Sequence, residues 1–247
     1  MKRKSVVLLC LLVLCLPGGA LAEGKIPILM YHSIAEFKGK GDKDLYVSPA
    51  EFERQVLYLR ENGFTPLTFE EWDKREDVTK PIFLTFDDGY KNNLKAYEIF
   101  KKLKTADFTP KGTFFVISDF IGRQNRLSES DLKMLVASDL VSVQSHTASH
   151  PELTKIDDLD AELKGSKEAI EKITNKPVIA LAYPFGSFNQ KVIAETKKEY
   201  DFGIATALNE SGGENARYEL SRIFVTGSMT LDQFAKAVER SQRKAPE

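Results

Sequence analysis

The 247-residue sequence contains little cysteine and little histidine. Its two cysteines, Cys10 and Cys15, both lie near the N-terminus, so the rest of the chain has no disulfide, no thiolate nucleophile and no cysteine metal ligand. The apolar run at the N-terminus, Ser5–Leu16, has 12 residues, which is short of the roughly 20 that a membrane span requires. These absences exclude a disulfide scaffold and a cysteine-dependent enzyme.

The N-terminus has the three parts of a secretion signal. Lys2–Lys4 is a positively charged start, the short apolar run follows it, and Ala20–Ala22 has the small residues of a cleavage site. We therefore expect residues 1–22 to be a signal peptide, cut before Glu23. The exported protein would be periplasmic, secreted or on the cell surface, with no stable membrane span after cleavage. An uncleaved membrane anchor is the alternative.

The expected mature chain, residues 23–247, has 225 residues, which suits one domain of barrel size. The whole chain has a net charge of −1, and loss of the three positive charges of the signal leaves −4. Acidic and basic residues are interspersed, which argues against nucleic acid as a partner. There is no internal repeat and no linker-like tract. The sequence leaves the oligomeric state open.

Short apolar runs alternate with helical patterns along this chain. Seven runs read as strands: Ile26–Tyr31, Ile82–Phe86, Thr113–Ile117, Val141–Ser145, Val178–Ala182, Phe202–Thr206 and Ile223–Thr226. Helix caps or apolar stripes indicate helices that start at Ser48 and end at Gly63, start at Ser128, run from Leu159 to near Asn175, and start at Thr230. This alternation predicts an α/β fold, either a barrel or a doubly wound sheet.

All three histidines, and one pair of acids, directly follow predicted strands. His32, His146, His150 and the pair Asp87–Asp88 each come just after an apolar run. The C-terminal ends of parallel strands gather on one face, where ligands bind. Two histidines and a carboxylate with open positions are a typical divalent-metal site. The sequence therefore predicts a metal-dependent enzyme.

The pair of acids needs a bend in the backbone. Neighbouring residues of a strand point to opposite faces, so Asp87 and Asp88 reach one site only if the chain turns, which Gly89 permits. Two carboxylates in one site also need different roles, such as a metal ligand beside a general base. The alternative interpretation is a simple turn.

The two later histidines stand four residues apart. Because Pro151 disfavours helix at His150, we expect His146–His150 to form a tight loop rather than a helix. A chance pair of surface histidines is the alternative. That alternative loses weight because Asp87 and Asp88 lie at the end of another predicted strand.

Thr85–Tyr90 and His146–His150 resemble the first two motifs of the polysaccharide deacetylases, carbohydrate esterase family 4 with the NodB-homology domain. The resemblance covers most of residues 26–240. It implies a distorted (β/α) barrel with about seven parallel strands. It also implies that Asp87 is the catalytic base and that Asp88, His146 and His150 bind the metal.

Two departures narrow the resemblance. Ala182 stands where the family carries an arginine that pairs with the base, and no histidine follows His150 to act as the general acid. With the opening Leu29–Ile34, this pattern is similar to the poly-N-acetylglucosamine deacetylase branch, in which the acid comes from the first strand. His32 fits that role, and a histidine that merely caps the strand is its alternative. Arg222 is a candidate for the missing arginine, with a surface position as its alternative.

The resemblance implies a hydrolase that removes N-acetyl groups from an N-acetylglucosamine-containing polysaccharide and releases acetate. In the mechanism that this resemblance implies, a divalent ion, zinc first and otherwise cobalt, nickel or iron(II), would activate a water. Asp87 would take the water's proton, the backbone N–H of Phe185 and the metal would stabilise the oxyanion, and His32 would protonate the leaving amine. Three neighbouring aromatic residues could stack on sugars or belong to the core, and they are not assigned to the site: Tyr31, Tyr90 and Phe188.

Two other hypotheses stay open. The missing arginine is compatible with a catalytically weak domain that binds glycan, which acetate release would exclude. Two histidines and a carboxylate also suit non-haem iron oxygenases, which a requirement for oxygen would reveal. The sequence does not choose among poly-N-acetylglucosamine, peptidoglycan, chitin oligomers and O-acetyl esters.

Overall fold

The computed structural model describes residues 26–206 and 216–242, so the predicted signal peptide lies outside the described residues. The strands are β1 (Ile28–Tyr31), β2 (Ser33–Ile34), β3 (Tyr46–Val47), β4 (Thr65–Leu67), β5 (Pro81–Phe86), β6 (Gly112–Val116), β7 (Val141–Ser145), β8 (Ala180–Ala182), β9 (Phe202–Ile204) and β10 (Ile223–Phe224). The α-helices are α1 (Pro49–Glu61), α2 (Leu94–Leu103), α3 (Glu129–Val136), α4 (Ser166–Thr174), α5 (Gln190–Glu199) and α6 (Leu231–Gln242).

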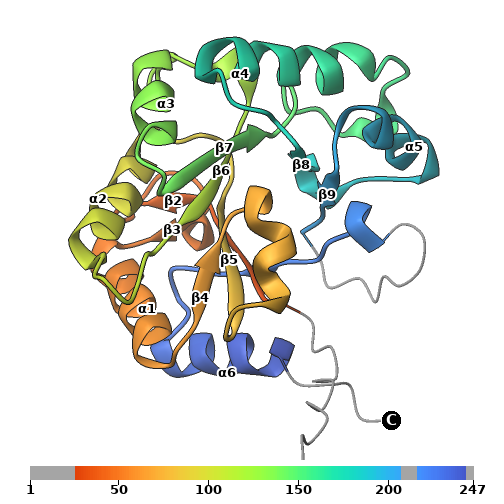
Figure 1. The fold of residues 1–247 in the computed structure, drawn as a ribbon. Coiled ribbons are helices and arrows are strands. Elements are labelled where there is room, and N and C mark those ends of the chain that lie inside the picture. Colours follow the sequence, from red (N-terminus) through yellow and green to blue (C-terminus); the bar gives the residue numbers. More distant parts are fainter. Residues whose placement is uncertain (1–25, 207–215, 243–247) are drawn as a thin grey trace, which may run out of the picture.

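The main sheet is parallel and curls into a distorted barrel. Its strand order is β10-β1-β5-β6-β7-β8-β9, and β4 pairs with the first residues of β5. Figure 1 shows the helices arranged around the outside of this sheet. Leu220 pairs with Ile204 of β9, and Ile223 pairs with Leu29 of β1, so one short segment joins the two sheet edges. The barrel is therefore the correct one of the two predicted architectures.

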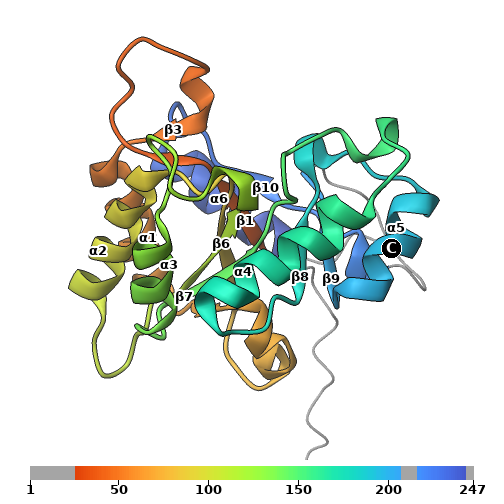
Figure 2. The same ribbon diagram turned by 90° about the horizontal axis from the view of Figure 1, so that it is seen from above.

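Alternation along the strands creates two separate cores. Outward side chains such as Leu84 and Phe114 pack beneath the helices. Inward side chains such as Phe83 and Phe115 fill the barrel, together with Phe69 from the 3₁₀ segment η2 (Phe69–Glu76). The Phe69 and Phe83 ring centroids are 5.0 Å apart. In Figure 2, η2 and β3 lie at opposite ends of the barrel. The segment η2 thus plugs one end of the apolar interior.

Most predicted helix starts are confirmed. The Ser48 side chain accepts a hydrogen bond from the Glu51 N–H, and Ser128 forms a reciprocal capping box with Asp131. Thr230 and Gln233 also exchange hydrogen bonds. These pairs satisfy N–H groups that have no partner inside the helix.

Several elements differ from the prediction. β4 was not anticipated, because it is short and contains Pro66, a residue that is rare within strands. The predicted strand Val178–Ala182 pairs only from Ala180, since the N–H groups of Ile179 and Ala180 donate to the Gln144 side chain. The predicted helix that ends near Asn175 begins with a π-helical turn, Ala161–Gly165. Among the described residues, no helix is long and apolar enough to cross a membrane.

Candidate active site

Inward-facing polar residues gather at the C-terminal end of the barrel. Tyr31 of β1 is in register with Phe86 of β5, and the Asp87 N–H donates to the Tyr31 carbonyl at 2.9 Å. His32 and Asp87 are therefore neighbours one position further on. Phe83 faces the interior, so alternation brings Asp87 to the same side. His146 follows β7 in the same way, and the predicted convergence of these residues is confirmed.

The backbone bends beside Asp87, as the sequence predicts. Asp88 itself has φ of +69°, and Gly89 follows with φ of +62°. A left-handed conformation is unusual for a residue with a side chain. At Gly89 a Cβ atom would also lie 3.1 Å from Val116 Cγ1. The turn brings the Asp88 carboxylate back toward the site instead of leaving it on the outer face.

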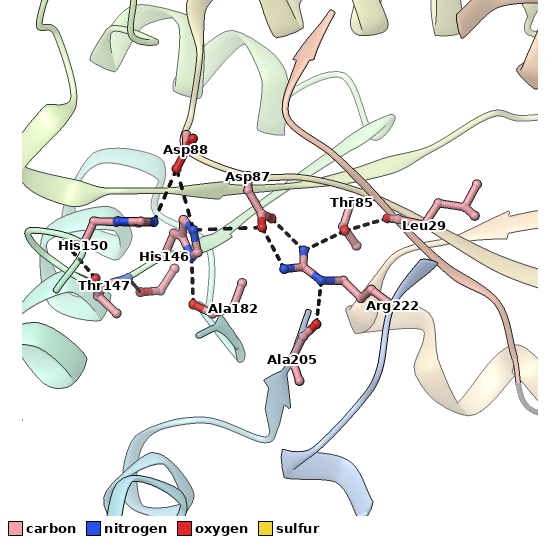
Figure 3. Close-up of polar contacts among 11 residues, drawn as sticks. Leu29, Thr85, Asp87, Asp88, His146, Thr147, His150, Ala182, Ala205 and Arg222 are labelled. Atoms are coloured by element: carbon pink, nitrogen blue, oxygen red, sulfur yellow. Dashed lines mark hydrogen bonds and ion pairs between the residues drawn. The ribbon is translucent and has the colours of Figure 1, made fainter. Parts of the chain in front are cut away.

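Asp88, His146 and His150 form a cluster that fits a divalent ion. Asp88 Oδ1 lies 3.7 Å from His146 Nε2 and 3.6 Å from His150 Nε2. The three donor atoms all lie within 4.8 Å of one another. Figure 3 shows the carboxylate facing both rings. Imidazole nitrogens and a carboxylate oxygen are ligands that zinc and iron(II) accept.

A hydrogen bond fixes the tautomer of His146. Its Nδ1 lies 2.8 Å from the Ala182 carbonyl oxygen, which can only accept, so Nδ1 carries the proton and Nε2 keeps its lone pair. Burial lowers the pKa of His146, although the charges of Asp87 and Asp88 act in the opposite direction. A buried, neutral imidazole is the form that binds a metal.

His150 lies in a tight loop, as predicted. Thr147 has φ of +67° and His150 has φ of +66°, so the segment has no helical backbone. The His150 N–H donates to Thr147 Oγ1 at 3.0 Å. The rings of His146 and His150 approach to 4.7 Å between centroids.

Arg222 pairs with Asp87 through both of its terminal nitrogens. Each guanidinium nitrogen lies 2.7 Å from one oxygen of the Asp87 carboxylate. Arg222 Nε donates to the Ala205 carbonyl, and Thr85 Oγ1 accepts a further bond (Figure 3). Arg222 is 2% exposed, so the alternative of a surface position is wrong. Arg222 lies in the segment before β10, whereas Ala182, the position at which the family carries its arginine, lies in β8.

The electrostatics of Asp87 follow from this pair. Burial raises the pKa of Asp87, but the charge of Arg222 and its hydrogen bonds to the carboxylate outweigh burial and hold that pKa well below its usual range. Asp87 is therefore an ionised carboxylate in a fixed orientation. Its Oδ2 lies 4.0 Å from His146 Nε2, which places it beside the candidate metal ligands.

His32 lies beside the two acids without a partner for one of its nitrogens. Among the described residues, no group forms a hydrogen bond to its buried Nδ1. Its ring contacts Phe224 edge-on, with centroids 5.6 Å apart. Burial lowers the pKa of His32, while the nearby charges of Asp87 and Asp88 partly oppose that shift.

Phe185 lies next to the candidate metal ligands. It has φ of +58°, and its ring centroid is 4.7 Å from that of His150. With 67% of its surface exposed, it is one of two exposed large apolar side chains among the described residues. A hydrogen bond of 2.8 Å between Ser187 and Thr154 ties this turn to the segment after His150.

Comparison with known proteins decides the family. The family described as polysaccharide deacetylase matches residues 74–202. Over 224 residues the chain is 31% identical to YxkH of Bacillus subtilis, a protein named as a polysaccharide deacetylase, and the match covers 87% of this chain and 76% of YxkH. The chain belongs to the polysaccharide deacetylase family. The resemblance inferred from the two sequence motifs is thereby confirmed.

Two further members of this family are informative. The crystal structure of a polysaccharide deacetylase from Bacillus cereus shares 47% sequence identity with a TM-score of 0.84, over 87% of this chain and 69% of that one. The poly-β-1,6-N-acetyl-D-glucosamine N-deacetylase of Staphylococcus epidermidis is 27% identical over 210 residues, which cover 74% of this chain and 69% of that protein. The deacetylase fold thus extends over most of the chain.

The aromatic residues that were not assigned to this deacetylase site lie in different surroundings. Tyr31 is buried and donates to Gln55 at 2.9 Å, so it belongs to the core. Phe188 packs on Tyr183 with a centroid distance of 5.1 Å. Tyr90 is half-buried, and the guanidinium of Arg126 lies over its ring at 4.0 Å from the centroid. Burial and the charge of the Asp88 carboxylate raise the pKa of Tyr90.

Two polar contacts of the site were not anticipated from the sequence. Thr85 accepts a hydrogen bond from Arg222 and donates one to the Leu29 carbonyl at 2.7 Å. Glu162 hydrogen-bonds to the loop between the two histidines. Thr85 could have been found from its inward position two residues before Asp87, whereas Glu162 gives no comparable sequence signal.

Proposed function

We propose that the protein is an exported, metal-dependent N-deacetylase that acts on a polysaccharide containing N-acetylglucosamine. The observation that carries this proposal is the cluster of Asp88, His146 and His150 beside an ionised, bidentately held Asp87. The similarity to the Staphylococcus epidermidis poly-β-1,6-N-acetyl-D-glucosamine N-deacetylase supports the substrate class. The signal-like residues 1–22 support export.

Asp88, His146 and His150 would hold the divalent ion, and zinc suits this set of ligands. When bound, the ion lowers the pKa of a water toward neutrality and polarises the substrate carbonyl. The Nδ1 bond of His146 to Ala182 keeps the opposite nitrogen of that ring free to ligate.

Asp87 is the proposed general base. Its two bonds to Arg222 prevent the carboxylate from rotating and keep it ionised, so it can accept a proton at an oxygen that faces His146. The low pKa makes Asp87 a weak base, and the strong positioning compensates for that weakness by holding the acceptor oxygen where the proton is released.

His32 is the proposed general acid. Because burial lowers its pKa, the protonated ring is a stronger acid than a free imidazolium and gives its proton more readily to the departing nitrogen. The backbone N–H of Phe185 is the proposed oxyanion donor, and its left-handed φ is a feature of the turn over His150.

The hypothesis of a catalytically weak glycan-binding domain rested on the missing arginine at Ala182. Arg222 now supplies a bidentate partner for Asp87, so that reason no longer holds. The described residues therefore give no reason to prefer the glycan-binding hypothesis.

The test is acetate release by the purified protein from a panel of acetylated glycans. We expect release from poly-N-acetylglucosamine or chitooligosaccharides with zinc bound, and little from Asp87→Asn, whose amide cannot accept a proton. Asp87→Asn should retain its zinc, since Asp87 is not a proposed ligand. A zinc-loaded protein that releases no acetate from any glycan would refute the proposal. Turnover that requires oxygen would indicate an oxygenase instead.

A further inference from the structure

The loop that carries His150 has an unusual backbone. Both Thr147 and His150 have positive φ, and neither is glycine. A positive φ strains the backbone of a residue other than glycine, and this conformation persists only where surrounding contacts hold it. Part of the restraint comes from the segment after β6, because the N–H groups of Ser118 and Asp119 donate to the carbonyls of Thr147 and Ala148. These bonds hold the carbonyl side of the loop.

The N–H side of the same loop is held by one carboxylate. Glu162 Oε2 accepts hydrogen bonds from the consecutive N–H groups of Ala148 and Ser149, at 2.9 and 2.8 Å. Glu162 Oε1 accepts a third bond from Ser149 Oγ at 2.5 Å. Consecutive N–H groups in a turn form a concave anion-binding arrangement. Here a side chain of the protein itself occupies it.

Glu162 lies in the π-helical turn Ala161–Gly165. Such turns are rare and occur often at functional sites. Two hydrogen bonds hold this turn in place. The Tyr200 hydroxyl donates to the Leu163 carbonyl at 2.6 Å, and Ser166, the residue after the turn, has its Oγ 2.5 Å from Ser145 Oγ. Ser145 directly precedes His146. The element that carries Glu162 is thus fixed to the strand that carries the first histidine.

We propose that Glu162 is a positioning residue for the metal site. Its carboxylate holds the Ala148–Ser149 backbone so that the His150 ring faces Asp88 before an ion binds. Glu162 does not touch the proposed ion, and it acts through the loop. This inference rests on the metal site of the proposed function. Groups that orient a metal ligand from outside are typically worth about 10- to 100-fold in metal affinity.

The experiment compares zinc affinity in three variants of the purified, metal-stripped protein. Glu162→Gln keeps the shape but removes the charge, and Glu162→Ala removes the acceptor altogether. Glu168→Gln is the matched control, because Glu168 is exposed on α4 and loses the same charge. Zinc affinity is measured by competition with a chromogenic chelator, at a temperature where circular dichroism shows each protein folded.

We expect zinc to bind about tenfold more weakly to Glu162→Gln and up to about 100-fold more weakly to Glu162→Ala. Glu168→Gln should match the wild type. Saturating zinc should restore the kcat of Glu162→Gln, because the groups that act on substrate are intact. A purely structural role would lower the melting temperature and leave the affinity of the folded protein unchanged.

Wild-type zinc affinity in folded Glu162→Ala would overturn the inference. If Glu162→Ala does not fold, Glu162→Gln and Ser149→Ala decide, and unchanged affinity in both would overturn it equally. A wild-type protein that binds no zinc would refute the metal site and this inference together. If the wild type binds zinc but releases no acetate, the proposed function fails, while the affinity comparison still tests Glu162.

Discussion

The two ends of the barrel interior are built from the same strands but have opposite chemistry. At the end covered by η2, inward positions carry aromatic side chains, including Phe69, Phe83 and Phe202. At the C-terminal end of the strands, the next inward positions carry Asp87, and Arg222 lies against it. Thr85 stands two positions after Phe83, and Asp87 stands two positions after Thr85, directly after the end of β5. The change from apolar side chains to a buried ion pair thus occurs within five residues of the chain.

The difference shows which end stabilises the barrel. Burial of large aromatic side chains favours folding through apolar area and ring contacts. A buried ion pair gains little, because the cost of removing both charges from water offsets their attraction. The plug therefore stabilises the strands, and the strands in turn fix the positions of Asp87 and His146. Four predictions separate these contributions, in addition to the tests of Asp87 and Glu162 given above.

Replacement of His32 with Asn should have the largest effect of the four, and that effect should be on the rate of N-deacetylation. An amine is too poor a leaving group to depart unprotonated, whereas an activated aryl ester needs little assistance. We expect a loss of about 10²–10⁴-fold in N-deacetylation and a much smaller loss with an aryl acetate. Metal content should not change. Equal losses on both substrates, with a lower melting temperature, would show that His32 is structural.

Arg222→Ala should combine a loss of stability with a loss of activity. It leaves the Asp87 carboxylate buried without its bidentate partner, which typically costs about 3–5 kcal/mol. Urea unfolding measures this change. The double variant Asp87→Leu with Arg222→Leu removes both charges and should be more stable than Arg222→Ala, though inactive. A double variant as unstable as the single one would mean that the pair itself stabilises the fold.

Phe69→Ala tests the plugged end. Removal of a buried phenylalanine creates a cavity among the surrounding rings, and we expect a loss of about 3 kcal/mol in the free energy of unfolding. Zinc affinity and kcat should stay at wild-type values below the melting transition. Weaker zinc binding by the folded variant would show that the plug directly shapes the metal site.

The sequence predicts the strands and the metal cluster for a physical reason. Periodicity and helix caps are local, and the C-terminal ends of parallel strands must meet on one face. His32, Asp87 and His146 therefore converge, as expected. The bend at this pair was predicted, but the left-handed conformation of Asp88 itself was not, because residues with a side chain seldom adopt it.

The partners of these residues were harder to predict. Arg222 is 135 residues from Asp87 in the chain, and nothing in its neighbourhood distinguishes a buried arginine from a surface one. Glu162 lies in a π-helical turn, which has no reliable sequence pattern. Residue types indicate chemistry, whereas the groups that orient them depend on how distant segments meet.

The smallest expected effect is on how the free energy of unfolding depends on pH. This dependence should differ between variants at the polar end and at the apolar end of the barrel. Burial lowers the pKa values of His32 and His146 in the metal-free fold. Below the ordinary histidine pKa of about 6.5, the unfolded chain therefore binds more protons, and stability falls as the pH decreases. The slope cannot exceed about 1.4 kcal/mol per pH unit for each histidine. The pKa of Asp87 is lowered too, so its contribution to stability is complete above about pH 4 and is lost only in stronger acid.

The measurement is urea unfolding between pH 7.5 and 5, with a chelator present. The free energy of unfolding should depend less steeply on pH for His32→Asn than for the wild type. Phe69→Leu, at the apolar end, should keep the wild-type slope, and a His32→Asn slope equal to it would mean that His32 titrates normally.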